Sequence, residues 1–224
     1  MPTVKVAACG ARFSRLDTDG TPVYDSATGA VTVPVGIMSF KFSYEREEGA
    51  EIFKKDSCGV PLISIKQDDI IKRVNWELVL GQDDYIMYEI TDLAELIVDG
   101  SDVVGMSVPL AAGCEAGSGR NPFALEVWSQ QFVCAAAYSR PYQRIILPYN
   151  TAVPTEETRE TDPSEPTFEG SGRANPNFGD GPFGDLDLLD TESAADKGIH
   201  FLDDDSVPEA PEDGGYSETP PEAS

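Results

Sequence analysis

The chain has 224 residues, 40% of them hydrophobic, and a net charge of −24 from 40 acidic and 16 basic residues. Its length suffices for one β domain with its own core. Its acidity excludes a protein that wraps nucleic acid through a basic surface, because phosphates need Lys and Arg to displace their counterions. The net charge is −7 over residues 1–150 and −17 over residues 151–224, which sets the last third apart.

The N-terminal third predicts a short strand over residues 3–9 and a turn-rich segment over residues 16–30. Asp17, Asp19 and Gly20 begin like a calcium-binding loop. No Glu follows at the twelfth loop position, however, and no helix is predicted on either side. We therefore expect a plain Asp/Gly turn at this position.

Two long strands with a polar and an apolar face are the clearest pattern of the chain, because apolar side chains alternate with polar ones. In residues 31–47 the apolar face holds Met38, Phe40, Phe42 and Tyr44. In residues 70–80 it holds Ile70, Val74, Trp76, Leu78 and Leu80, interrupted by Lys72. The polar faces of the two strands carry Ser39, Lys41, Ser43, Glu45 and Glu47, and Arg73, Asn75 and Glu77.

A charged segment, residues 47–59, joins the two strands and is bounded by glycines. We expect it to form a long loop or an extended hairpin, with strand character returning at residues 62–66. A helix is predicted over residues 84–97, because Ile86, Ile90, Leu93, Ala94 and Ile97 recur at helical spacing. Asp83 or Asp84 would cap its start, and Asp99-Gly100 would end it.

Further strands are predicted at residues 103–110, 123–133 and 142–149. The composition shifts to Pro, Glu, Thr and Asp after residue 150, apart from an aromatic segment at residues 175–189. Residues 190–224 have the composition of a disordered acidic tail. The predicted organisation is therefore one domain over residues 1–189 and an acidic low-complexity extension over residues 190–224.

The residues that carry chemistry do not converge on a site. The single histidine, His200, lies in the predicted tail, and the four cysteines have no metal-binding spacing. We expect these thiols to be free and buried, and the paired aspartates to be caps or solvated faces. The sequence therefore predicts a protein that is not an enzyme and holds no cofactor or metal.

The sequence lacks both of the apolar signals that would direct a chain to or through a membrane. The N-terminal MPTVKVAACGARFSR has no signal-peptide core. No apolar run approaches the roughly eighteen residues that a membrane span needs. We expect synthesis and assembly inside a cell, without membrane insertion.

An ordered set of segments spans residues 11–189: RLDTDGTPV, the block EREEGAEIFKKDSCGVPLISIKQDDIIKRVNWELVL, a helix, VVGMSVPL, ALEVWSQQF and NPNFGDGPF. In this order the chain resembles the major tail (tail tube) proteins of siphovirus-type bacteriophages, especially those that infect actinobacteria. The acidic extension after residue 189 departs from the family pattern, and residues 45–58 are unusually charged for it.

The resemblance implies a mainly β fold, a β-sandwich or split barrel with one flanking α-helix and a long loop or hairpin. Six copies would close into a ring with an inner β-barrel, and rings would stack into the tube that delivers the genome. The implied partners are further copies of the chain, the tape measure protein, the tail terminator and the distal tail or baseplate proteins. Double-stranded DNA would pass without specific binding. The implied location is the virion tail, assembled in the host cytoplasm.

The resemblance also implies roles for two residue sets. The predicted lumen-facing residues are Ser39, Lys41, Ser43, Glu45, Glu47, Arg73, Asn75 and Glu77. The predicted inter-ring loop residues are Glu48, Gly49, Glu51, Ile52, Phe53, Lys54, Lys55 and Asp56. A DNA conduit is expected to be electronegative, yet Lys41 and Arg73 offset Glu45 and Glu77. Glu47 and other loop acids must supply any excess, or the chosen register is wrong by one residue.

Two alternative functions stay open from the sequence. One is another ring-forming tail component, such as a tail terminator or baseplate hub. The other is an acidic β-sandwich module that binds a molecule on the host surface.

Overall fold

The computed structural model describes residues 3–24, 30–34, 36–55, 57–58, 61–82, 84–100, 102–108, 121–133, 140–153, 165–184, 186 and 197–209. These residues form a mainly β structure with one short helix. Its elements are β1 (Thr3–Arg15), β2 (Val31–Thr32), β3 (Ile37–Glu47), β4 (Glu51–Lys55), β5 (Pro61–Lys66), β6 (Ile70–Leu80), α1 (Tyr85–Ile90), β7 (Glu95–Asp99), β8 (Asp102–Ser107), β9 (Phe123–Val133), β10 (Tyr142–Val153), β11 (Thr167–Arg173) and β12 (His200–Asp204).

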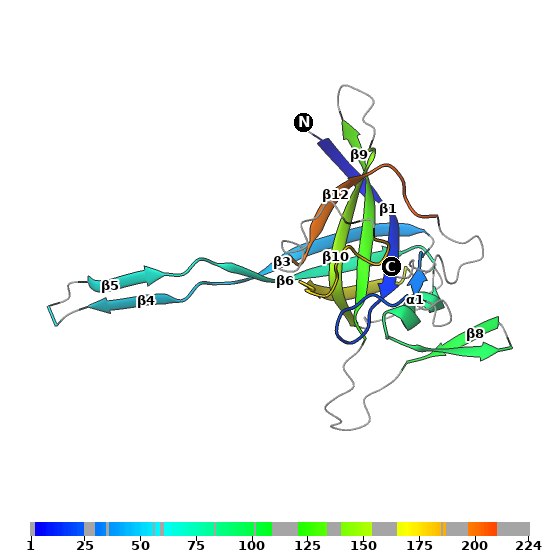
Figure 1. Ribbon diagram of the computed structural model, residues 1–224, viewed down its shortest axis with the longest axis horizontal. Helices are drawn as coiled ribbons and strands as arrows, with labels where there is room; N and C mark the ends of the chain where they lie inside the picture. Colours follow the sequence, from blue (N-terminus) through cyan, green and yellow to red (C-terminus); the bar gives the residue numbers. More distant parts are fainter. Residues whose placement is uncertain are drawn as a thin grey trace.

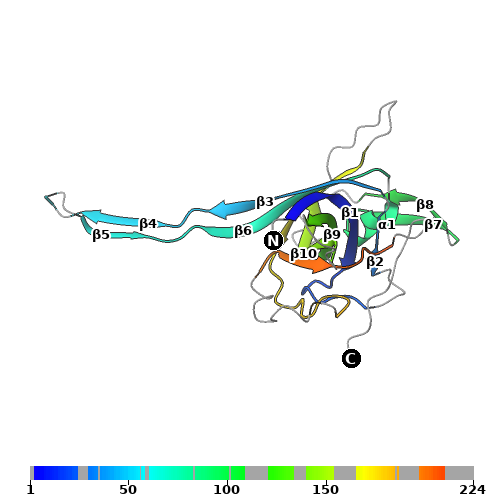
Figure 2. The same ribbon diagram turned by 90° about the horizontal axis from the view of Figure 1, so that it is seen from above.

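One antiparallel sheet organises the body, in the order β2-β1-β9-β10-β11-β6-β3, with β12 added beside β10. A register shift between Leu147 and Asn150 divides β10. The first half of β10 pairs with β12, and its second half pairs with β11. The sheet curls around its core without closing into a barrel among the described residues (Figures 1 and 2). Two hairpins, β4–β5 and β7–β8, project from this body.

The main core lies inside the curled sheet and draws apolar side chains from both of its halves. Its large members include Phe13, Trp76, Leu78, Met87, Phe123, Leu125 and Phe168. The Nε1 of Trp76 donates to Oδ1 of Asn150 at 3.0 Å, and Nδ2 of Asn150 donates to the carbonyls of Phe123 and Leu147. These bonds satisfy the side chain of Asn150 and the carbonyls beside the register shift of β10. The polar side chain of Asn150 can therefore lie in the core.

The strands predicted from alternation are largely confirmed. Strands β6 and β9 have the predicted bounds, while β1 and β10 are longer than predicted. Strand β3 begins at Ile37 instead of residue 31, because Gly36 has a φ of 72° and separates it from β2. The turn at Asp17–Gly20 is a plain one, in which Asp17 and Asp19 accept bonds from nearby backbone N–H groups.

The predicted helix is wrong in its second half. Helix α1 starts where expected, with Oδ1 of Asp84 accepting from the Ile86 N–H at 3.0 Å, but it ends at Ile90. The hydroxyl of Thr91 then donates to the Met87 carbonyl, and Asp92 adopts a φ of 56°. The chain continues as the β7–β8 hairpin, in which Ile97 is 50% exposed.

The predicted disordered tail is also wrong for residues 197–209. Within them, β12 pairs with β10 from Tyr142↔Asp204 to Ile146↔His200. The ring of Phe201 lies 6.0 Å from that of Phe42 on β3, so β12 covers part of the apolar side of that strand. The rest of the predicted extension, residues 190–196 and 210–224, lies outside the described residues.

Gly170 on β11 offers a test of how closely the two halves of the sheet pack. A Cβ there would lie 2.6 Å from Cε2 of Trp76 and 2.7 Å from the Thr151 carbonyl oxygen. We expect Gly170→Ala to lower the free energy of unfolding by about 1–3 kcal/mol, as overpacked cores do. Urea denaturation measures this change. Gly105→Ala is the matched control, because its nearest contact would be Cδ1 of Ile97 at 3.9 Å; an equal loss there would contradict the packing argument.

Candidate functional site

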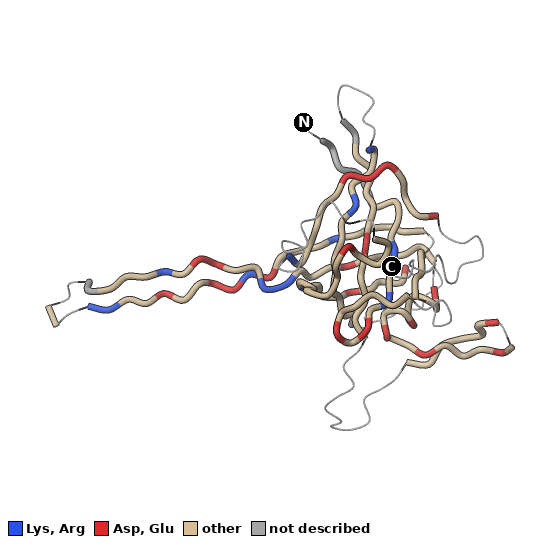
Figure 3. The backbone as a smooth tube through the Cα atoms, in the orientation of Figure 1, with Lys and Arg blue, Asp and Glu red and all other residues tan. Residues whose placement is uncertain are grey.

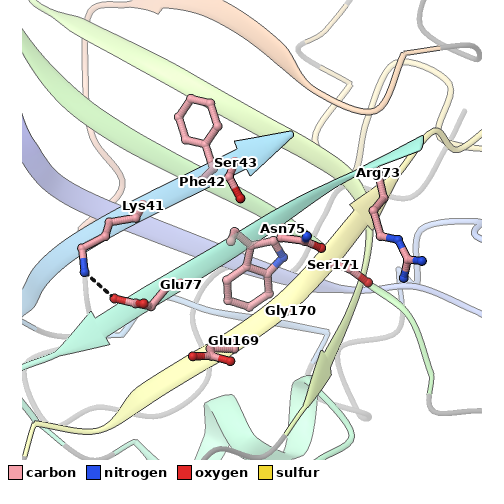
Figure 4. A pocket seen from close by; sticks show the side chains of 10 residues that line it. Lys41, Phe42, Ser43, Arg73, Asn75, Glu77, Glu169, Gly170 and Ser171 are labelled. Carbon is pink, nitrogen blue, oxygen red and sulfur yellow. Dashed lines mark hydrogen bonds and ion pairs between the residues drawn. The ribbon is translucent and has the colours of Figure 1, made fainter. Parts of the chain in front are cut away.

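A polar trough of about 770 Å³ crosses β3, β6 and β11 on the side of the sheet away from the core (Figure 4). We define it by the side chains of Lys41, Ser43, Arg73, Asn75, Glu77, Glu169 and Ser171. Strand register places them in rows: Lys41, Glu77 and Glu169 form one row, and Ser43, Asn75 and Ser171 form the next. The predicted polar faces of the two long strands are therefore brought together.

The basic residues of this face are paired with acids. Lys41 Nζ lies 2.6 Å from Glu77 Oε1, and Arg73 Nε lies 2.8 Å from Glu45 Oε2. A register shift after Glu45 leaves Lys72 without an opposite residue, and its ammonium lies 3.6 Å from the Glu47 carboxylate. Exposed pairs of this kind contribute little to stability. Their effect here is to neutralise the cations locally.

The face has no excess of acid, contrary to the electronegative conduit expected from the resemblance. Glu169 adds one carboxylate to the paired residues. Arg173, at the end of the same strand, adds one guanidinium, which lies 4.1 Å from the ring centre of Tyr149. Glu47 is paired with Lys72 and supplies no surplus.

The predicted facing of β3 is confirmed, because Phe40 and Phe42 pack against the core and the opposite side chains form the trough. A one-residue slip is therefore excluded. The apolar face is only partly covered, since Met38 is 54% exposed and Tyr44 39%. Three of the predicted lumen residues do not line the trough. Ser39 lines an apolar groove beside Met38, and Glu45 and Glu47 lie beyond the trough in their ion pairs with Arg73 and Lys72.

Sequence reasoning missed β11, which supplies Glu169 and Ser171 to the trough. Its signal was present, because Thr167, Glu169, Ser171 and Arg173 alternate with Phe168, Gly170 and Gly172. Glycine is depleted in strands and hides this alternation. The two glycines occupy core-facing positions where Trp76, Leu147 and Asn150 leave no room for a larger residue.

The second candidate surface is the arm, which we define as residues 48–69. It continues the β3–β6 ladder beyond the body as the β4–β5 hairpin (Figure 1). The extended hairpin predicted for this segment is confirmed, and it contains the predicted inter-ring residues except Asp56, which lies outside the described residues. Register places Ile52, Lys54, Ile63 and Ile65 on one side of the hairpin. Phe53 and Lys55 lie on the other, with the ammonium 5.0 Å from the ring centre.

Exposed apolar side chains concentrate on the two projecting hairpins. Among the described residues, eleven of the fifteen exposed large apolar side chains belong to the arm, to the first two residues of β6 at its base, or to residues 97–108. They are Ile52, Phe53, Ile63, Ile65, Ile70 and Ile71 at the arm and its base, and Ile97, Val98, Val103, Val104 and Val108. Large apolar patches of this kind mark surfaces that another molecule covers.

A buried ionic cluster lies on the outer side of β1, β9 and β10. The carboxylate of Glu126, 0% exposed, contacts Arg12 Nε at 2.5 Å and also Arg144. The Arg12 guanidinium stacks on Phe183 of the aromatic segment. Burial acts to raise the pKa of Glu126, but the two guanidiniums outweigh it, and the pKa lies below its usual value. Because the cluster is sealed from solvent, it is a structural feature and offers no binding site.

The described residues offer little for catalysis or metal binding. No three His, Cys, Asp or Glu side chains among them gather where they could share a metal ion. His200 is buried on β12, where burial and the nearby Lys197 lower its pKa. The side chains of Cys9 and Cys58 are exposed, contrary to the expected burial, while Cys114 and Cys134 lie outside the described residues. No helix in the described part of the chain has the length and apolar character to span a bilayer.

No family model matches the chain, and no curated protein matches its sequence significantly.

Proposed function

We propose that this chain is the tail tube subunit of a siphovirus-type bacteriophage, a structural virion protein without enzymatic activity. Six copies close into a ring, rings stack through the arm, and the polar trough lines the channel for the genome. The neighbours in the tail are the tape measure protein, the tail terminator and the distal tail or baseplate proteins.

The observation that carries this proposal is the position of the polar trough on the long β3–β6 ladder, beside an open edge of the sheet. Strand β3 ends the sheet order, so its outer edge has no hydrogen-bonded strand among the described residues. An open edge of eleven residues is a template for pairing with another chain. Pairing around a ring removes the edge, and a barrel of many strands leaves a water-filled lumen.

The ion pairs within the trough and at the strand residues next to it support the passage of DNA without retention. Lys41, Lys72 and Arg73 each lie beside a carboxylate, so phosphate groups would have to displace that carboxylate to bind. Binding of DNA by basic residues is driven by the release of counterions from the phosphates, and a cation already neutralised by a protein carboxylate offers less of it. A balanced face is therefore compatible with a conduit.

Electron cryomicroscopy of the purified full chain tests the proposal. We expect rings that stack into tubes, with Lys41, Asn75 and Glu169 facing the central axis. Rings that never stack would favour a tail terminator or baseplate component instead. Monomers under all conditions, or tubes whose lumen is lined by other residues, would contradict the proposal.

A further inference from the structure

We propose that the arm of one copy docks on the β7–β8 hairpin of a second copy. The inference deepens the proposed function and rests on it for the stacked arrangement, because it names the surface that receives the arm. It commits to another copy of the same chain as the occupant of both exposed hairpins.

The positions of the two hairpins suit a head-to-tail contact. The arm leaves the body at one end of the long axis, and β7–β8 projects near the other end (Figure 1). Figure 2 shows the same separation from above. A contact between two different surfaces of identical subunits either closes into a ring or continues as an open filament, and stacking requires the open form.

Both hairpins have apolar surface that their own subunit leaves uncovered. Ile52 and Ile65 stand opposite each other on the arm, and Val98 and Val103 do so on β7–β8. All four are exposed. Each hairpin is a two-stranded ladder, so each strand has one edge without a sheet neighbour in the part of the chain that is described. Faces and edges are therefore both available to a partner.

The outer part of the arm and the β7–β8 hairpin carry net charges of opposite sign. The outer part of the arm, residues 51–66, carries Lys54, Lys55 and Lys66 against Glu51 and Asp56, a net charge of +1 in a chain of net charge −24. Glu48, Asp68 and Asp69 at the base of the arm bring residues 48–69 to a net charge of −2. Residues 84–108 contain no Lys or Arg, and the hairpin carries Glu95, Asp99 and Asp102 (Figure 3). Lys54, Lys66, Glu95 and Asp99 take no part in the ion pairs found among the described residues. Complementary charge of this kind directs and orients association.

One side of the arm and one side of β7 also match in the placement of their charged and apolar residues. On one side of the arm, Lys54 stands among Ile52, Ile63 and Ile65. On β7, alternation places Ile97 between Glu95 and Asp99 on a single side. An apolar face with a central cation thus meets an apolar residue flanked by two anions.

Photocrosslinking in the full-length protein tests the contact directly. Ile65 is replaced by p-benzoylphenylalanine, assembled protein is irradiated, and the cross-linked peptides are mapped by mass spectrometry. We expect cross-links between subunits to fall within residues 95–108. Cross-links between subunits to any other segment, or none between subunits in assembled material, would overturn the inference.

Charge reversal gives a second test that includes a rescue. We expect Lys54→Glu or Glu95→Lys alone to raise the protein concentration needed for filament growth by about tenfold or more, because like charges meet across the interface. The double variant Lys54→Glu/Glu95→Lys should recover most of this loss. Lys197→Glu makes the same charge change at an exposed residue of the body and should assemble normally.

The two proposals fail in different ways. Tubes that form normally from Lys54→Glu, together with cross-links outside residues 95–108, would remove the docking surface and leave the tube function standing. Conversely, a wild-type protein that forms no rings, yet cross-links from Ile65 into residues 95–108 of another copy, would remove the tube function and keep the docking surface.

Discussion

A chain in which an Asn-Gly turn replaces residues 50–67 is expected to fold normally and to stop assembling beyond a single ring. Register along the arm pairs Glu47 with Ile70 and Glu51 with Lys66, so residues 49 and 68 lie opposite each other and suit a two-residue turn. The removed side chains of the arm are largely exposed, so the core loses no packing. Thermal denaturation measures folding, and sedimentation velocity with electron microscopy measures assembly.

Ser64→Ala is the matched control for removal of the arm. It changes an exposed polar residue on the side of the arm opposite to Lys54 and keeps the hairpin intact. This variant should form tubes like the wild type. Tubes of normal length from the shortened chain would show that rings stack through some other surface.

Alternation predicted the strands well where one side of the strand is buried and the other is wet. In β6, Val74, Trp76, Leu78 and Leu80 are buried at every second position, and the bounds of the strand follow from this pattern. The pattern fails beyond the body, where Ile70 is exposed although it keeps the same period. Alternation alone therefore does not tell an apolar strand residue that the body buries from one that stays exposed.

The helix was predicted too long, because residues buried within the helix and residues buried after it recur at the same spacing in the sequence. Ile86 and Ile90 are buried by the helix, whereas Leu93 and Ala94 are buried in the irregular segment that follows. The sequence contained a competing signal, since a Gly-Ser pair at residues 100–101 between two apolar β-branched runs is typical of a two-residue hairpin turn. Gly100 has a φ of 69° in the turn between β7 and β8, which suits that interpretation.

The contribution of the acidic C-terminal part could not be predicted from its composition. Strand β12 is held by Trp128 Nε1, which donates to Asp204, and by Gln131 Nε2, which donates to Asp203. The partners of these carboxylates lie more than seventy residues away. Asp203 and Asp204 lie in a segment whose composition predicted a solvated tail. In the structure they accept hydrogen bonds from side chains of the sheet.

The ionic cluster at Glu126 was equally hidden, because Arg12 lies 114 residues before Glu126 in the chain and Arg144 lies 18 after it. In the sequence, Glu126 is one acidic residue in a strand of alternating character. Only the pairing of β1, β9 and β10 places the two guanidiniums on either side of its carboxylate.

Replacing Glu126 by Gln should produce the largest loss of stability among single substitutions in the body. It would leave Arg12 and Arg144 buried without their anion, and breaking a buried pair in this way costs about 3–5 kcal/mol. Urea denaturation at pH 7 measures the free energy of unfolding. Glu169→Gln removes an exposed carboxylate of the trough and should change it by less than about 0.5 kcal/mol.

The pH dependence of the free energy of unfolding distinguishes loss of the Glu126 charge from loss of packing around this side chain. Because the folded state holds the pKa of Glu126 below the value of 4.5 expected for the unfolded chain, the ionised group stabilises the fold above that pH. This contribution is lost as the pH falls through the lower pKa of the folded state. Stability should therefore decline less steeply on acidification in Glu126→Gln than in Glu169→Gln. Equal acid slopes in the two variants would show that the Glu126 carboxylate does not stabilise the fold through its charge.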